Sequence, residues 1–186
     1  ENLISENTIT DNGRFGLEIK NPDGSGASSG SGSIVVEENI VSLTSPVADL
    51  RDIAGIAVMR RGVLAGNVDN PTGVYLRSNQ VSGYQQTSSS DGFGIVIGGT
   101  NHTVENNTLN NNDVGVQQQS GHLPYPGDGD QNNLADQYFG RDNSPYTCGN
   151  TISGNIYNSN GTDYREVPGT ISALGTVLNV DTETYF

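Results

Sequence analysis

Acidic and amide side chains alternate along one stretch of the chain in a spacing that could hold a metal ion. The oxygen-bearing residues, at relative positions one, three, five and nine, are Asp128, Asp130, Asn132 and Asp136. Alternate residues of such a stretch can turn their oxygens toward one Ca²⁺ ion. The match is partial, because Asn133 replaces the usual Gly and Phe139 replaces the acid that would close the site. The spacing therefore predicts either a calcium site or a flexible acidic loop.

The same stretch, Ser120 to Pro145, also carries side chains that could bind a carbohydrate: Tyr125, Tyr138 and Arg141. Sugar rings stack their C–H faces on aromatic planes, while their hydroxyl groups form hydrogen bonds with neighbouring polar groups. The aromatic side chains could equally pin the stretch onto the rest of the protein. Both uses stay open.

A six-residue phrase recurs along the chain and indicates the elements that must position these side chains. It consists of an apolar residue, two polar residues, an Asn, a spacer and a second apolar residue. It occurs at Ile4–Ile9, Val36–Val41, Leu76–Val81 and Val104–Leu109, with a weaker copy at Cys148–Tyr157. A second phrase of Gly, apolar, variable and apolar residues follows, as in Gly55-Ile56-Ala57-Val58.

The spacing of the repeated Asn residues is irregular. These residues are Asn7, Asn39, Asn79, Asn107 and Asn150. Helical repeats have a nearly fixed length, whereas a solenoid of short strands accepts loops at its corners. We therefore predict an all-β solenoid, a parallel β-helix of about five turns with long inserted loops. We place the coil at residues 1–166, with a C-terminal strand pair or cap at residues 167–186 that folds over the end of the stack.

The predicted coil assigns each residue of a strand to an inward or an outward face. The inward columns are Ile4, Val36, Leu76 and Val104, and Ile9, Val41, Val81 and Leu109. One outward column contains Ser5, Glu37, Arg77 and Glu105, and a second contains Glu18, Ala57, Val96 and Gly115. The first could be a surface ion-pair ladder worth about 0–1 kcal/mol per pair, or Arg77 and Tyr75 could line a sugar-binding groove.

The corner Asn is expected for two reasons. Asn tolerates the left-handed backbone region that a sharp bend requires, and its amide can bond to the equivalent amide one turn away. The two His residues, His102 and His122, are predicted to lie on the surface rather than to act as general bases.

The paired phrases resemble the repeats of right-handed parallel β-helix proteins of the pectin-lyase-like superfamily, over roughly Asn2 to Tyr157. The resemblance implies a right-handed coil. It implies an activity less specifically, because members include polysaccharide lyases, glycoside hydrolases, alginate epimerases, tailspikes and surface proteins. A lyase would line one groove with acidic metal ligands and a basic proton acceptor, and the second outward column shows no such cluster.

Composition narrows the possible partners. The formal charge of −13 with a single Lys argues against nucleic acid and anionic membrane surfaces. No apolar run approaches the ~18–20 residues that a membrane-spanning helix needs, so membrane insertion is not expected. An acidic, lysine-poor surface suits a secreted or cell-surface protein or a salty habitat.

Two functions are consistent with these patterns. The first is an extracellular protein that contacts or processes a polysaccharide, with calcium as the one expected cofactor, and that forms the C-terminal part of a larger protein with further turns upstream of Glu1. If it is an enzyme, a polysaccharide lyase, epimerase or glycoside hydrolase is expected. The second is a non-catalytic structural or adhesive surface protein, tailspike-like or a matrix element, that self-assembles.

Overall fold

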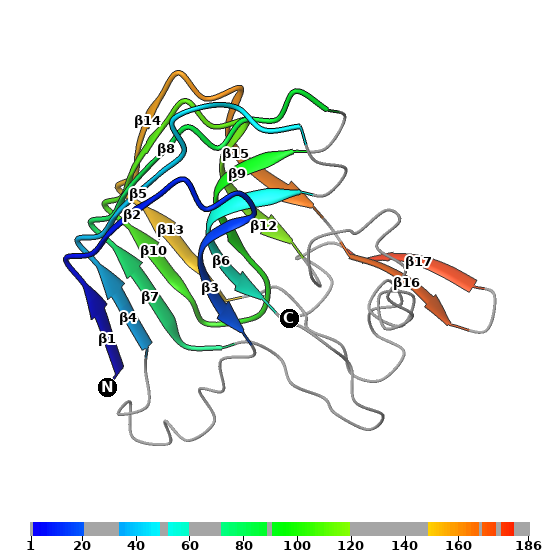
Figure 1. Cartoon of the computed structure of the whole chain (residues 1–186). Helices are drawn as coiled ribbons and strands as arrows, with labels where there is room; N and C mark the ends of the chain where they lie inside the picture. Colours follow the sequence, from blue (N-terminus) through cyan, green and yellow to red (C-terminus); the bar gives the residue numbers. More distant parts are fainter. Residues whose placement is uncertain are drawn as a thin grey trace.

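The computed structural model describes residues 2–20, 34–48, 52–59, 72–88, 91–119, 149–167, 169–173 and 176–180. Within these ranges every regular element is a strand, and none is a helix that could cross a membrane. Fifteen of the strands form three parallel sheets of five strands each. The chain is thus a right-handed parallel β-helix of five turns, as predicted (Figure 1).

Each turn of the coil contributes one strand to each sheet. The first sheet contains β1 (Asn2–Ser5), β4 (Ile34–Glu37), β7 (Val74–Arg77), β10 (Thr103–Glu105) and β13 (Thr151–Ser153). The second contains β2 (Thr8–Thr10), β5 (Ile40–Ser42), β8 (Gln80–Ser82), β11 (Thr108–Asn110) and β14 (Ile156–Asn158). The third contains β3 (Phe15–Lys20), β6 (Ile53–Met59), β9 (Gly92–Ile97), β12 (Val114–Gln119) and β15 (Thr162–Val167).

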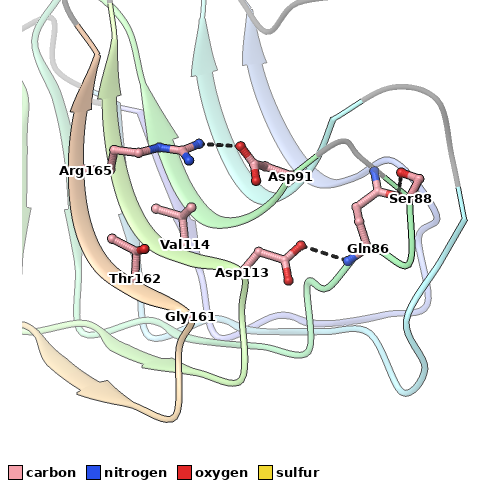
Figure 2. A pocket seen from close by; sticks show the side chains of 8 residues that line it. All are labelled: Gln86, Ser88, Asp91, Asp113, Val114, Gly161, Thr162 and Arg165. Atoms are coloured by element: carbon pink, nitrogen blue, oxygen red, sulfur yellow. Dashed lines mark hydrogen bonds and ion pairs between the residues drawn. The ribbon is translucent and has the colours of Figure 1, made fainter.

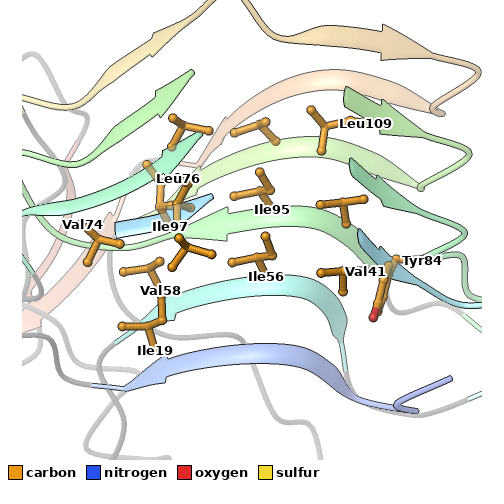
Figure 3. Close-up of a cluster of buried hydrophobic side chains, with 14 of the residues drawn as sticks. Ile19, Val41, Ile56, Val58, Val74, Leu76, Tyr84, Ile95, Ile97 and Leu109 are labelled. Carbon is orange, nitrogen blue, oxygen red and sulfur yellow. The ribbon is translucent and has the colours of Figure 1, made fainter. Parts of the chain in front are cut away.

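The inward columns have the predicted register. Val36 pairs with Ile4 and Leu76, and Val104 pairs with Leu76 and Ile152. Val36, Leu76 and Val104 are fully buried, as are the corresponding residues of the second sheet (Figure 3). Because each such side chain contributes about 1.5–3 kcal/mol on burial, these columns are the main stabilising feature of the coil.

The third sheet bends around this core at a column of four glycines, Gly16, Gly55, Gly94 and Gly115. A Cβ atom on Gly55 would lie 2.2 Å from Val81 Cγ1 and 2.8 Å from the Gly94 carbonyl oxygen. The other three positions are similarly crowded. The backbone can approach the core this closely only because these residues have no side chain.

The second outward column was predicted incorrectly at two points. Val96 pairs with Gln117, so Gln117 takes the place assigned to Gly115. Ala57 and Val96 are fully buried rather than exposed. They belong to a cluster on the outer face of the third sheet that consists of Ala54, Ala57, Met59, Phe93, Val96 and Val114, with Phe15 packed against it.

The corner Asn residues form the predicted ladder. Asn39 Oδ1 accepts hydrogen bonds from the backbone N–H (3.0 Å) and Nδ2 (2.9 Å) of Asn7. The same pair of bonds joins each further turn, through Asn79, Asn107 and Asn155. The fifth member is therefore Asn155, and the prediction of Asn150 was wrong.

The expected backbone role of the Asn was also wrong. The residues with positive φ immediately precede the ladder Asn: Glu6, Glu38, Ser78, Asn106 and Gly154. The ladder Asn therefore contributes to the corner through the hydrogen bonds of its side chain and not through a left-handed backbone.

His102 is buried, in contrast to the surface position predicted for it. Its Nδ1 accepts a hydrogen bond from the Val74 N–H at 3.1 Å, and its own N–H donates to Asn150 Oδ1 at 2.7 Å. His102 and Asn150 thus join successive turns at a corner before the first sheet, where they are structural.

The C-terminal segment contains the expected strand pair. β16 (Gly169–Ala173) pairs with β17 (Thr176–Val180) in an antiparallel sheet. Its placement over the end of the coil stays a prediction.

Candidate functional site

An open depression of about 390 Å³ lies on the outside of the coil, where the third, fourth and fifth turns enter the third sheet (Figure 2). Its lining residues are Gln86, Ser88, Asp91, Asp113, Val114, Gly161, Thr162 and Arg165. Successive turns bring these residues together from parts of the sequence up to 79 positions apart, from 86 to 165. The lining is mostly polar and includes two carboxyl groups and one guanidinium group.

Asp113, which directly precedes β12, lines the depression and anchors its backbone. Its Oδ2 accepts hydrogen bonds from the backbone N–H groups of Gln86 and Gly92, both at 2.8 Å. These bonds tie the segment between β8 and β9 to the following turn. Asp113 is therefore both a structural anchor and a source of acceptor oxygen at the surface.

Arg165, on β15, is held by three contacts. Its Nη2 lies 2.6 Å from Asp91 Oδ2, and its Nε donates to Gln117 Oε1. Its Cζ lies 5.5 Å from the centre of the Phe93 ring, within the range of a cation–π contact. The guanidinium is thus preorganised beside Asp91, and the ion pair compensates much of the Asp91 charge.

Asp52 occupies the position equivalent to Asp91 in the preceding turn, and its side chain is buried, with the residue only 7% exposed. Its Oδ1 accepts the Asp91 N–H at 2.9 Å. Loss of solvation on burial raises the pKa of Asp52 to about 6, and the charge of Asp91 acts in the same direction. The Asp91 N–H and the charges of Arg165 and Arg14 oppose this shift without cancelling it.

The cluster of apolar side chains beside the depression offers no stacking platform. Phe93, Val96 and Val114 are at most 2% exposed. Binding by aromatic stacking on this part of the described surface is therefore not supported, and polar contacts dominate.

Tyr75 and Arg77 lie on β7, on the outer face of the first sheet and apart from the depression. Tyr75 is 39% exposed. Arg77 Nε lies 2.6 Å from Glu37 Oε2, and Arg77 also pairs in register with Glu105. The ion-pair ladder is confirmed for Glu37, whereas the sugar-binding role stays a prediction.

The remaining predicted site residues lie outside the described residues. These are Tyr125, Tyr138, Arg141, Asp128, Asp130, Asn132 and Asp136. His122 also falls in the range 120–148. Among the residues that the structure does describe, no group of three or more His, Cys, Asp or Glu is placed to hold a metal ion.

Sequence reasoning missed the residues that the depression brings together. The sequence nevertheless contains a pattern that indicates this cluster. An Asp stands two or three residues before three of the glycines in the column of the third sheet, at Asp52, Asp91 and Asp113. An Asp that recurs at the entrance of the same sheet predicts a cluster, since equivalent residues of successive turns lie one above the other.

A second hollow, of about 450 Å³, lies at the C-terminal end of the coil. It is lined by Gln118, Asn150, Ile152, Tyr157 and Tyr164. Four of these five residues belong to the fifth turn, so the hollow marks the end of the described coil.

Comparison with protein-family models, curated proteins and solved structures finds no significant match.

Proposed function

We propose that this protein is an extracellular β-helix protein that binds a polysaccharide across the depression on the third sheet. The observation that carries the proposal is the convergence of Asp91, Asp113 and Arg165 in one open hollow of about 390 Å³. The resemblance of the repeats to the pectin-lyase-like superfamily supports it, because many members of that superfamily act on polysaccharides.

The chemistry of the lining favours a hydroxyl-rich ligand. Carboxylates accept hydrogen bonds, and paired hydroxyl groups of a sugar can donate two of them to one carboxylate. Arg165 is already engaged by Asp91 and Gln117, so little positive charge is left for an acidic sugar. Together with the net charge of −13, this favours a neutral or cationic polysaccharide over a polyuronate.

Binding is better supported than catalysis. A proton donor to a glycosidic oxygen needs a raised pKa and direct access to the substrate. Asp52 has the raised pKa but does not line the depression. A hydrolase, lyase or epimerase activity would need a further group there.

The proposal is tested by measuring affinity for xylan, mixed-linkage glucan, chitosan and polygalacturonate. Thr162→Tyr adds a ring to the exposed β15 position inside the depression and should reduce binding at least tenfold. Thr151→Tyr makes the same change at an exposed position on β13 and should have no effect. Absence of binding to every glycan, or equal binding by the two variants, would refute the proposal. New reducing ends or unsaturated products from any of these glycans would show that the protein also cleaves the polysaccharide.

A structural or adhesive surface role is the second candidate. The observation that favours it is the rigid scaffold, in which three sheets and an Asn ladder repeat without interruption over five turns. Such a protein would show no preference among glycans and would be recognised by its assembly.

A further inference from the structure

The sequence carries the acceptor triplet for N-linked glycosylation, Asn-x-Thr with x not Pro, at Asn101, Asn106 and Asn160. In this modification the Asn Nδ2 attacks the anomeric carbon of a lipid-linked pyrophosphoryl oligosaccharide. A C–N bond forms, the bond from that carbon to the pyrophosphate breaks, and Nδ2 gives up a proton. Transfer takes place before the chain folds, so the fold selects which modified chains can reach the native state.

Asn101 and Asn106 lie at corners of the fourth turn, where a sugar can be accommodated. Both residues are exposed, and both have a positive φ, of 57° and 55°. Neither side-chain amide has a hydrogen bond to a residue that the structure describes. A sugar on Nδ2 of either residue therefore displaces no bond of the described coil.

The fifth turn leaves space beside both amides. Gly149 occupies the position equivalent to Asn101, and Gly154 the position equivalent to Asn106. A Cβ atom on Gly149 would lie 2.8 Å from Asn101 Oδ1, and one on Gly154 would lie 2.5 Å from Asn106 Oδ1. The amides can occupy these places only because the next turn has no side chain there.

Asn160 differs from the other two, because its amide is part of the coil. Its Oδ1 accepts the Asn112 N–H at 3.1 Å and Asn112 Nδ2 at 3.0 Å, and its Nδ2 donates to the Leu109 carbonyl at 3.0 Å. The residue is half-buried. A sugar on this Nδ2 would replace a hydrogen of an amide whose orientation these bonds fix, and it would stand beside Gly161 and Thr162 in the lining of the depression.

We propose that Asn101 and Asn106 carry N-linked glycans in the folded protein and that Asn160 does not. The two residues directly flank β10 (Thr103–Glu105), one on each side. Their glycans would bracket the outer face of the first sheet and hinder a large ligand from reaching Tyr75 on the neighbouring β7, while the depression on the third sheet stays open. The inference rests on the extracellular location in the proposed function and not on polysaccharide binding.

Secretion of the full chain from a eukaryotic cell line, followed by digestion with a peptide N-glycosidase, tests the proposal. The enzyme converts each glycosylated Asn into Asp, which peptide mass spectrometry locates in the sequence. We expect conversion at Asn101 and Asn106 and none at Asn160. Partial digestion should increase the electrophoretic mobility in two steps, one for each glycan.

Matched substitutions of the Thr in each triplet separate glycosylation from changes in folding. Thr108→Ala should remove the glycan of Asn106, whereas Thr108→Ser keeps the hydroxyl group and should keep the glycan. Thr103→Ala and Thr103→Ser should act in the same way on Asn101. Thr162→Ala is the control, because it destroys the triplet at Asn160 without touching the ladder amide, and the number of glycans should stay the same.

The proposal is overturned if neither Asn101 nor Asn106 is glycosylated, or if the folded, secreted chain carries a glycan on Asn160. A glycan on only one of the two corners refutes the assignment of the other. Polysaccharide affinity measured on the same samples separates this inference from the proposed function. A glycosylated chain that binds no polysaccharide counts against the function alone, and an unglycosylated chain that binds one counts against this inference alone.

Discussion

At the scale of single residues, the corner amides show why a polar side chain can be the most constrained residue of a β-helix. Asn79 is fully buried, and its Oδ1 accepts two bonds from Asn39. Its own N–H and Nδ2 bond to Asn107 Oδ1 and to the Val36 carbonyl. Every polar atom of the side chain is used, which is the condition under which burial of an amide is favourable.

Replacement of Asn79 by Ala should therefore destabilise the protein strongly. It leaves the buried Asn39 N–H without its acceptor and removes the Nδ2 bonds to the Val36 carbonyl and to Asn107 Oδ1. A buried polar group left without a partner costs about 1–3 kcal/mol. We expect a loss of about 3 kcal/mol or more in the free energy of unfolding, measured with urea. The matched variant Asn7→Ala removes an exposed end member and should cost less than about 1 kcal/mol. Equal losses would contradict the ladder as a source of stability.

The raised pKa of Asp52 makes stability depend on pH. The folded-state pKa of about 6 lies above the ordinary Asp value of 3.8, so the folded protein binds this proton more tightly than the unfolded chain. The resulting stabilisation is fully present below the unfolded pKa and is lost as pH rises through about 6. At neutral pH the buried charge of Asp52 therefore lowers the free energy of unfolding.

Asp52→Asn should remove that cost. At about pH 7.5 we expect the free energy of unfolding to rise by up to about 3 kcal/mol, provided that the Asn oxygen accepts the Asp91 N–H. Near pH 4 the variant and wild type should be almost equally stable. Asp163→Asn, which changes an exposed carboxyl, is the control. Urea unfolding at the two pH values is the measurement, and a benefit of the same size at both would show that burial of the charge is not the cause.

The sequence predicted the ladder, whose positions depend on the type of side chain. It did not predict the residues with positive φ, whose positions depend on the backbone conformation. The ladder was predictable because only an amide both donates and accepts in this geometry. The left-handed residue was not, since Glu6, Ser78 and Gly154 share no property. The ladder bonds outweigh the cost of about 1 kcal/mol that a left-handed non-Gly residue carries.

At the scale of elements, the three sheets differ in how well their register could be predicted. The first two have apolar residues at fixed distances from the Asn, so their inward columns follow from the sequence. In the fourth turn, by contrast, Gly115 stands between two apolar residues that lie on opposite faces of the sheet. Val114 belongs to the outer cluster and Val116 to the inner core. Alternation alone cannot assign a face there, because burial on both sides removes the polar positions that mark the outside.

The glycine column of the third sheet should be intolerant of any side chain. Gly55→Ala places Cβ within 2.2 Å of Val81 Cγ1 and 2.8 Å of a backbone oxygen, so the backbone must shift. We expect a loss of at least about 3 kcal/mol in the free energy of unfolding, or failure to fold. Gly13→Ala is the control, because no atom lies within 4 Å of its added Cβ, and it should be nearly neutral. Thermal unfolding followed by circular dichroism distinguishes the two.

At the scale of the whole molecule, fold was far more predictable than site. Five copies of one phrase were enough for a solenoid, because each turn repeats the same hydrogen bonds and the same inward residues. The depression depends on which outward side chains of different turns meet. The positions of Asp91 and Asp113 before the glycine column do indicate that these two residues meet, whereas no such pattern marks Arg165.

The calcium site stays a prediction that the intact chain can test. If Asp128, Asp130, Asn132 and Asp136 bind Ca²⁺, isothermal titration should give heat that saturates at about one ion per chain. Asp128→Ala combined with Asp130→Ala should abolish this heat. Asp11→Ala combined with Glu18→Ala removes two charges elsewhere and should not. Heat that survives the first double substitution would place calcium at another site.

The Asn ladder has a consequence for the electrostatics of the coil. In the ladder bonds each Oδ1 accepts from the preceding turn and each Nδ2 donates to the following turn, so the five side-chain amides share one orientation. The second N–H of each inner Nδ2 donates to a backbone carbonyl of the preceding turn. Their dipoles therefore add along the axis instead of cancelling, as peptide dipoles do in an α-helix. Amides in such a chain also polarise one another, so the central bonds should be stronger than those at the ends. We therefore expect the ladder to contribute a partial negative charge at the first turn and a partial positive charge at the fifth, although the described coil is made only of sheets.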